Sequence, residues 1–561
     1  MIRRLFRLVN DEWGGMHQAA VLLGVFSLIS QLLGLVRDRL LAHTIGPSAT
    51  LDIYYAAFRI PDLIYLSVAS LASITVLMPF LIKELDAGGK AAARKFFNEV
   101  LSGFLLLMIV VSTAVFILMP LIAPLIAPGF TAEELHQLVG ASRIMLLSPI
   151  FMGLSNMLGT VTQLLRKFVV FAISPIFYGA GIICGILFLY PLFGVYGLAM
   201  GVAFGALLHL LVQIPTIFAA GFTPKLSAHL ERSTLRQVAM LSLPRTLGLS
   251  MNSIALLVLM GIGTTLGEGS ISIFNLAFNL ETTPIGIIGI SYAVASFPLL
   301  SETFSRGKIK EWQRCILDTV RQIIFWSLPI TALMIVLRAQ IVRITLGSGA
   351  FSWSDTKLTA AALALLSVGI IGQNLVLVLV RAYYSAHNTR TPLVINTFSS
   401  LVMIGGAFGL VRLFQNNLDF QYFVESLLRV ENTPGTVVLM LPLAYATGML
   451  LNALLHWIDL RRNYLTDIKG VRRTSFESTT AAVGIGLVSY IMLNVFARVF
   501  NLETFWGVFG QGVLAGVVGI VAGIVILALL GSEQLSELFA ALKRKFWKVD
   551  LVTSVPLPEK E

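Results

Sequence analysis

The sequence predicts an all-α protein that crosses a membrane many times. Hydrophobic residues make up 57% of its 561 residues, and charged residues make up only 12%. Apolar runs of about 20 residues, the length that an α-helix needs to cross a bilayer, recur along the whole chain. These runs are continuously apolar, whereas the strands of a bacterial β-barrel alternate over about ten residues. The composition excludes a soluble domain and favours a polytopic helical membrane protein.

Taken in order, the apolar runs predict about fourteen transmembrane helices. The first follows the stretch MIRRLFRLVNDEWGGMHQ, which lacks the short apolar core and small-residue cleavage site of a signal peptide. Each later run is separated from the next by a charged, glycine-containing or proline-containing segment. The predicted spans are 18–42, 53–82, 97–119, 134–164, 168–190, 193–219, 237–264, 268–302, 318–343, 356–386, 391–413, 437–460, 477–500 and 505–531.

The basic residues predict the orientation of these helices. If the N-terminus is cytoplasmic, the inner segments hold 28 of the 40 Lys and Arg residues, and the outer loops hold about four. Such an asymmetry follows the positive-inside rule, so we expect both termini to lie in the cytoplasm. It also accounts for most of the +11 net charge without a nucleic-acid partner. The C-terminal LKRKFWK is expected to lie against anionic lipid.

An internal repeat divides the chain. FRIPDLIYLSVASLASITVLMPFL in the second span resembles LETTPIGIIGISYAVASFPLL in the eighth, and Pro61 pairs with Pro284. Two six-helix units with an even number of spans keep the same orientation, which places their pseudo-two-fold axis along the membrane normal. We predict an N-terminal lobe at 1–219, a C-terminal lobe at 220–461, and an extra helix pair with a basic tail at 462–561.

Two such lobes around a central cavity suit an alternating-access transporter. The sequence contains no phosphate-binding G-x-x-x-x-G-K-[ST] loop and no H-E-x-x-H zinc motif. A membrane-embedded transferase is the non-transport alternative, but the clustered carboxylates and histidines of such an enzyme are not evident. We therefore expect a transporter and no enzymatic activity.

Charged residues inside the predicted spans mark a candidate substrate path. Charges within a bilayer are costly and usually face a bundle interior or a wet cavity. Charged residues on the first two spans are Arg37, Asp38, Asp52, Arg59 and Asp62, and the second lobe adds Arg245 and Arg381. Arginine forks suit phosphate better than they suit a cation, so this cavity favours a pyrophosphate-bearing amphiphile. A cation–drug antiporter is expected to have a net acidic or aromatic cavity instead.

Three segments carry a resemblance to a known family. LGLVRDRLLAHTIGPSATLDIYYAAFRIPDLI, LPRTLGLSMNSI and RAYYSAHNTRTPLVIN resemble signatures of the MurJ (MviN) lipid II flippase family. This family belongs to the multidrug/oligosaccharidyl-lipid/polysaccharide (MOP) exporter superfamily. The resemblance implies a protein of the bacterial inner membrane that moves undecaprenyl-pyrophosphate-linked peptidoglycan precursor, lipid II, from the inner to the outer leaflet. A flippase for another polyprenyl-linked saccharide and a cation-coupled multidrug antiporter are the alternatives.

The resemblance also implies roles for individual residues. Arg37 matches a cavity arginine, Asp38 its acidic neighbour, Asp52 the acidic residue that opens the second span, and Arg59 the basic residue before the proline. Where the family usually has two further arginines, this chain has PDLIYLSVASLAS, so we expect Arg59 and Arg245 to serve in their place.

The resemblance bears on coupling and on the lipid tail as well. Some relatives bind sodium in the second lobe, where Asn252 and Asn396 are candidate ligands here; the membrane potential is the alternative driving force. No other cofactor is expected, and the protein is expected to act as a monomer. The extra helix pair would hold the polyprenyl tail.

Overall fold

A computed structural model of the protein describes residues 16–69, 74–165, 167–219, 221–223, 225–227, 251–465 and 468–546. Every regular element in these ranges is a helix. Eleven helical segments among them are long and apolar enough to cross a membrane. The predicted class, an all-α polytopic membrane protein, is therefore confirmed, whereas the count of fourteen spans stays a prediction.

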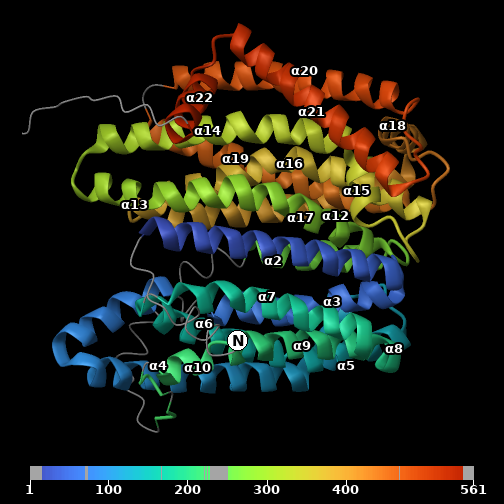
Figure 1. Ribbon diagram of the computed structural model, residues 1–561. Helices are drawn as coiled ribbons and strands as arrows, with labels where there is room; N and C mark the ends of the chain where they lie inside the picture. The colour runs from blue at the N-terminus through green and yellow to red at the C-terminus, as the bar shows by residue number, and fades with distance from the viewer. Residues whose placement is uncertain are drawn as a thin grey trace, which may run out of the picture.

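The first group of helices, here called the first bundle, precedes residue 220 (Figure 1). Within it α7 packs against α2 and α9, α6 packs against α9, and α3 packs against α5. Its elements are α2 (Met16–Thr44), α3 (Ala49–Ile64), the π-helix η1 (Tyr65–Ala69), α4 (Ile74–Ile126), α5 (Ala132–Met145), α6 (Leu147–Leu164), α7 (Phe168–Cys184), the π-helix η2 (Gly185–Leu189), α8 (Tyr190–Phe193), α9 (Val195–Leu211) and α10 (Ile214–Ala219).

The second bundle is built around α16, which packs against α12, α14 and α19. Its elements are the helix Met251–Thr264, α12 (Ser270–Ile285), the π-helix η3 (Gly286–Ile290), α13 (Ser291–Ser305), α14 (Ile309–Val336), α15 (Arg338–Thr345), α16 (Trp353–Ser385), α17 (Arg390–Asn416), α18 (Leu418–Leu428), the 3-10 helix η4 (Thr436–Leu439) and α19 (Met440–Asn463).

The C-terminal helices lie on the far side of the second bundle, away from the first (Figure 1). They are α20 (Lys469–Phe496), α21 (Phe505–Leu529) and α22 (Glu533–Phe546). α20 packs on both α14 and α21, and α21 also contacts α15, so the main helix packing of the pair is against the second bundle. The lobe boundaries predicted from the sequence, at residues 219 and 461, stay predictions.

A shared interruption agrees with the predicted repeat. α3 contains Pro61 and passes into η1, and α12 contains Pro284 and passes into η3. Proline has no N–H to donate to the preceding turn, and π-turns occur where the regular helical ladder is disturbed. The two segments that resemble each other in sequence are therefore interrupted at equivalent places.

The segment between the second and third predicted spans differs from the expected loop. α4 runs from Ile74 to Ile126, and the only non-helical residue within it is Gly89, at φ 69° and ψ −164°. Glycine adopts positive φ without steric cost, so two helices meet at this one residue. The alanine-rich stretch after it, KAAARKFF, has high helix propensity, which explains why the predicted loop is helical.

Candidate functional site

Arg37 and Asp38 form an ion pair on α2. The Arg37 Nη2 atom lies 2.7 Å from Asp38 Oδ1, and Arg37 Nε donates a hydrogen bond of 2.9 Å to the same oxygen. The Arg37 side chain is 27% exposed, whereas that of Asp38 is 4% exposed. The Asp38 carboxylate therefore holds the Nε and Nη2 side of the Arg37 guanidinium in place, while part of the side chain stays accessible.

Arg59 faces the second bundle from α3. Its Nη2 atom donates a hydrogen bond of 2.6 Å to Asn275 Oδ1 on α12. The amide nitrogen of Asn275 donates to Ile271 O at 2.8 Å, which leaves its oxygen toward the arginine. The Arg59 Nε atom is buried and has no hydrogen-bond partner among the described residues.

Tyr55 connects the surroundings of these two arginines. Its ring lies one turn before Arg59 on α3 and interacts electrostatically with Arg37, Asp38 and Arg59. Its buried hydroxyl has no hydrogen-bond partner in the described part of the chain. The structure thus brings Arg37, Asp38 and Arg59 together around a tyrosine that the sequence analysis missed. The i, i+4 spacing of Tyr55 and Arg59 on one helix face was the available signal.

Asp52 lies apart from this cluster, at the start of α3. Its Oδ2 accepts a hydrogen bond of 2.8 Å from Gly269 N, and its Oδ1 accepts bonds from Ser272 N at 2.7 Å and Ser272 Oγ at 2.5 Å. These donors belong to the N-terminus of α12, where unpaired N–H groups and the helix dipole favour an anion. Asp52 therefore caps a helix of the opposite bundle.

Other contacts join the bundles at the same end. Arg39 Nη1 donates 2.6 Å to Ile344 O, Ala350 N donates 2.9 Å to His43 O, and His43 Nδ1 lies 3.2 Å from Ser348 Oγ. Ala49 N donates 3.0 Å to Glu268 Oε1, and Gly129 N donates 3.0 Å to Thr264 Oγ1. We call these contacts, together with those of Asp52, the junction. It closes the predicted outer end between the bundles.

The two second-lobe arginines do not add to the observed cluster. Arg245 lies outside the described residues. Arg381 is half-buried, four residues before the end of α16. Since α16 begins at the junction end, Arg381 lies about 42 Å along it, whereas Arg59 lies about 15 Å along α3 from the same end. Arg381 is therefore near the opposite end of the molecule.

The candidate sodium ligands belong to separate networks. Asn252 hydrogen-bonds to the hydroxyl of Tyr445, which donates 3.1 Å to Gln373 Oε1. Asn396 Oδ1 accepts 3.1 Å from Asn452 Nδ2. Within the described ranges, no group of three or more His, Cys, Asp and Glu side chains is arranged to hold a metal ion. The two amides thus do not converge on one point through any of these bonds.

Glu281 extends the first of these networks. It is fully buried on α12 and accepts a short hydrogen bond from Gln373 Nε2. Its second oxygen, Oε2, has no partner in the described part of the chain. A single carboxylate therefore lies inside the second bundle, in contact with amide and hydroxyl groups and with no described basic partner within ion-pair distance.

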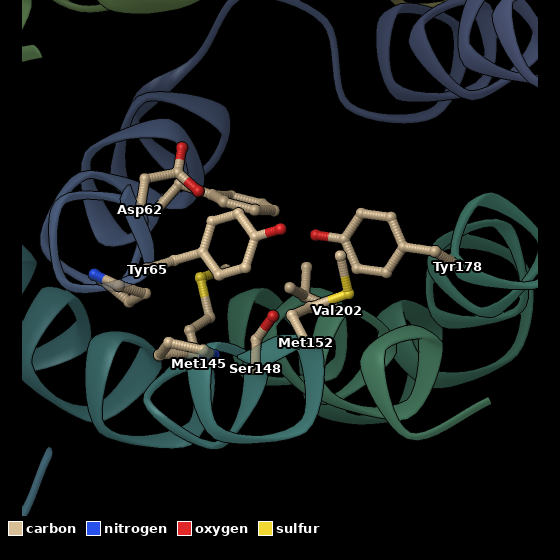
Figure 2. Close-up of a pocket in the computed structure, with 10 residues that line it drawn as sticks. Asp62, Tyr65, Met145, Ser148, Met152, Tyr178 and Val202 are labelled. Carbon is tan, nitrogen blue, oxygen red and sulfur yellow. The ribbon is translucent and has the colours of Figure 1, made fainter. Parts of the chain in front are cut away.

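A cavity of about 150 Å³ lies within the first bundle, next to Arg59 (Figure 2). Asp62 and Tyr65 reach it from α3 and η1, Tyr178 from α7, and Ser148 and Met152 from α6. Figure 2 shows the hydroxyls of Tyr65 and Tyr178 directed toward one another across the space. Of these residues, the sequence analysis named only Asp62, as one of the charges on the first two spans.

Comparison with protein families matches residues 41–510 to the family described as lipid II flippase MurJ. A probable lipid II flippase MurJ of Rhizobium tropici is 24% identical over 538 residues, which cover 94% of this chain and 96% of the relative. The corresponding protein of Vibrio cholerae is 25% identical over 502 residues, covering 85% and 95%. The matched region includes the end of α2, all of α3 and every junction residue except Arg39.

Solved structures resemble the fold. A lipid II flippase MurJ in an inward closed conformation aligns with a TM-score of 0.70 and 20% identity, covering 92% of this chain and 100% of that one. An inward-facing multidrug resistance MATE transporter of the MOP superfamily aligns with a TM-score of 0.62 and 16% identity, covering 82% and 98%. At these identities the structural likeness concerns the fold alone.

Proposed function

The chain belongs to the lipid II flippase MurJ family, and we propose that it moves lipid II from the inner to the outer leaflet by alternating access. It is a multi-pass inner-membrane transporter and not an enzyme. The observation that carries the proposal is the cluster of Arg37 and Arg59 around Tyr55, beside the second bundle. Two permanent positive charges with accessible or unpartnered N–H groups suit the diphosphate of such a lipid.

Arg37 and Arg59 would bind the diphosphate through different N–H groups. Asp38 fixes Arg37 from one side, so the remaining N–H groups of its fork are left to bind a diphosphate oxygen. Arg59 supplies its unpartnered Nε, and its bond to Asn275 can be exchanged for a bond to phosphate. Arg245 and Arg381, from the predicted second lobe, would bind the diphosphate at other stages of the cycle.

In this scheme Asp52 stabilises the junction and does not bind the diphosphate. Both of its oxygens are already engaged by α12, and a second anion beside them would be repelled. We propose that its three bonds hold the junction closed while the predicted central cavity between the lobes is open to the cytoplasm. Breaking them would accompany opening toward the outside.

The driving force is the membrane potential or a sodium gradient. Moving one charge through 100 mV is worth about 2.3 kcal/mol, which supports the first for a strongly anionic substrate. For the second, Asn252 and Asn396 remain the proposed ligands, each brought into use by rearrangement of its network. Transport that persists in sodium-free buffer and stops when the potential is collapsed would decide for the potential.

We further propose that the polyprenyl tail lies along the C-terminal helix pair and that the protein works as a monomer. α20 and α21 expose many large apolar side chains, including Leu487, Ile491, Val517 and Val521. Such surfaces suit contact with lipid chains. The diphosphate and sugars would remain in the predicted central cavity between the lobes while the tail stays in the bilayer.

Both termini are proposed to be cytoplasmic, which places the junction outside. Lys90 and Glu133 are exposed and lie on opposite sides in this arrangement. In a chain with Cys184 and Cys315 replaced by serine, an impermeant thiol reagent should label Glu133→Cys in intact cells and Lys90→Cys only after lysis. Labelling of Lys90→Cys in intact cells would invert the orientation.

The function is tested by complementation in a bacterium depleted of its own lipid II flippase. We expect the wild-type chain to restore growth and the appearance of lipid II on the outer leaflet. An exporter of another polyprenyl-linked saccharide would accumulate normally and restore neither. A cation–drug antiporter would instead raise dye efflux in the same membranes without moving lipid II, and either result would refute the proposal.

A further inference from the structure

We propose that the cavity beside Asp62 binds a primary alkylammonium group on the head group of the transported lipid. This inference rests on the proposed function and adds a second, oppositely charged contact to it. The cavity's lining is a carboxylate, three hydroxyl groups, aromatic rings and thioethers. Binding of a diphosphate by Arg37 and Arg59 does not require this cavity.

The carboxylate is available. Asp62 is exposed on α3, and its carboxylate has no hydrogen bond or ion pair within 4 Å among the described residues. Arg59, one turn earlier, interacts with it electrostatically but directs Nη2 to Asn275 on α12. The Asp62 side chain therefore keeps its acceptor capacity for a ligand.

The hydroxyl groups face the same space. Tyr65 accepts a hydrogen bond of 2.5 Å from Asn156 Nδ2, so its own proton or second lone pair remains for the cavity. Tyr178 hydrogen-bonds to Ser148, and its hydroxyl points toward that of Tyr65 (Figure 2). These oxygens line the same cavity as the Asp62 carboxylate and are additional acceptors for an N–H donor.

The rest of the lining distinguishes the kind of cation. Phe58, Pro61, Met145, Met152 and Val202 are apolar, and aromatic faces attract organic ammonium groups. A hard inorganic cation prefers six or more oxygen ligands in a tight shell. A cavity of about 150 Å³ is of the size that holds a benzene-sized group, and it suits an alkylammonium with part of its carbon chain.

The site adjoins the arginine cluster. The Tyr178 hydroxyl interacts electrostatically with both Asp62 and Arg37. Arg59 and Asp62, three residues apart, lie on adjacent positions of one helix face. A head group that carries a diphosphate and an amine could therefore reach Arg37 and Arg59 with one and Asp62 with the other. Opposite charges on neighbouring sites would fix its orientation.

The test uses the full chain in proteoliposomes with two lipids. One is a polyprenyl-pyrophosphate precursor with a free primary amine, and the other is the same lipid after N-acetylation. We expect wild type to bind and move the amine form about tenfold better, the effect of one charge-assisted hydrogen bond. Asp62→Asn should lose this preference, and Asp419→Asn, at an exposed position of α18, should keep it.

Each other result contradicts the inference in a recognisable way. Equal handling of both lipids by wild type refutes the cavity and leaves the flippase standing, whereas movement of neither refutes the proposed function as well. A preference that survives Asp62→Asn assigns amine recognition elsewhere. If transport requires sodium in place of potassium, and Asp62→Asn removes that requirement regardless of acetylation, the site holds an inorganic cation instead.

Discussion

Three adjacent charges on α2 lie in two different environments. Arg37 pairs with Asp38, and Asp38 is buried by that contact. Arg39 leaves the helix on another side, donates to Ile344 O and lies 5.8 Å from the centre of the Phe505 ring. Successive helical residues point about 100° apart, so a run of charges serves several surfaces at once. The cost of burying them is offset by a neighbouring carboxylate, a helix C-terminus and an aromatic face.

Replacement of Arg37 tests the diphosphate contact. Arg37→Ala should reduce flipping by tenfold or more, because each charge-assisted hydrogen bond contributes about 1.5–3 kcal/mol. Arg37→Lys should also be poor, since a point charge does not reproduce a bidentate fork. Outer-leaflet lipid II is the measurement, normalised to membrane abundance, with Arg412→Ala on α17 as the exposed control. Normal growth of Arg37→Ala in the depleted strain would remove Arg37 from the site.

The sequence could not predict which residues of the site contact one another. Arg37, Asp38 and Arg59 could be named because charges within apolar helices are conspicuous. The bond from Arg59 to Asn275, and those from Asp52 to Gly269 and Ser272, join residues more than 200 positions apart. Only the packing of α3 against α12 creates them. Tyr178 meets Asp62 and Tyr65 only through tertiary packing, because it comes from α7 whereas they lie on the continuous α3–η1 segment.

At the scale of elements, apolar length located the helices but not their extensions. α14 begins at Ile309, nine residues before the predicted span, and buries Trp312 and Ile316. α18 occupies a predicted outer loop and buries Val424 and Leu428. Both segments alternate charged and apolar residues with helical spacing, so they are amphipathic and fall below any threshold for a membrane span. Their stability comes from one packed face.

Loss of the α12 cap should open the junction. Asp52→Asn keeps the shape of the side chain but turns an NH2 group toward N–H donors, which costs about 1–3 kcal/mol. In a chain without Cys184 and Cys315, spin labels at Glu133→Cys and Asp419→Cys report the separation of the bundles at this end. We expect their mean distance to increase or a longer population to appear.

A cap within one bundle provides the comparison. Thr504 accepts 3.1 Å from Gly507 N at the start of α21, so Thr504→Ala removes a helix cap without touching the junction. It should lower the thermal midpoint by a few degrees and leave the label distance unchanged. An unchanged distance in Asp52→Asn would show that Asp52 does not hold the bundles together.

At the scale of the molecule, two bundles touch through the junction while the C-terminal helices attach to the second bundle. Arg321 on α14 pairs with Glu533 on α22 at 2.5 Å, and Gln322 Nε2 donates 3.3 Å to Glu537 Oε2. The sequence predicted the repeat because it recurs in residue pattern. Contacts between the two bundles, such as the bond from Ala49 N to Glu268 Oε1, decide which end of the molecule is closed. Such contacts leave no periodic pattern in the sequence.

Alternating access predicts that fixing the junction stops transport, whereas fixing α22 does not. His43 and Ser348 lie on opposite bundles with side-chain atoms 3.2 Å apart, and Gln322 and Glu537 are similarly close between α14 and α22. Each pair is changed to cysteine in a chain without Cys184 and Cys315 and treated with a short, membrane-permeant, reducible bis-thiol reagent. Crosslinked His43→Cys/Ser348→Cys should lose nearly all lipid II movement and regain it on reduction, because the bundles can no longer separate. Crosslinked Gln322→Cys/Glu537→Cys should retain it, since α22 moves with the second bundle. Full transport through a crosslinked junction would mean that lipid II crosses without opening this end, and the rocking of the two bundles would have to be abandoned.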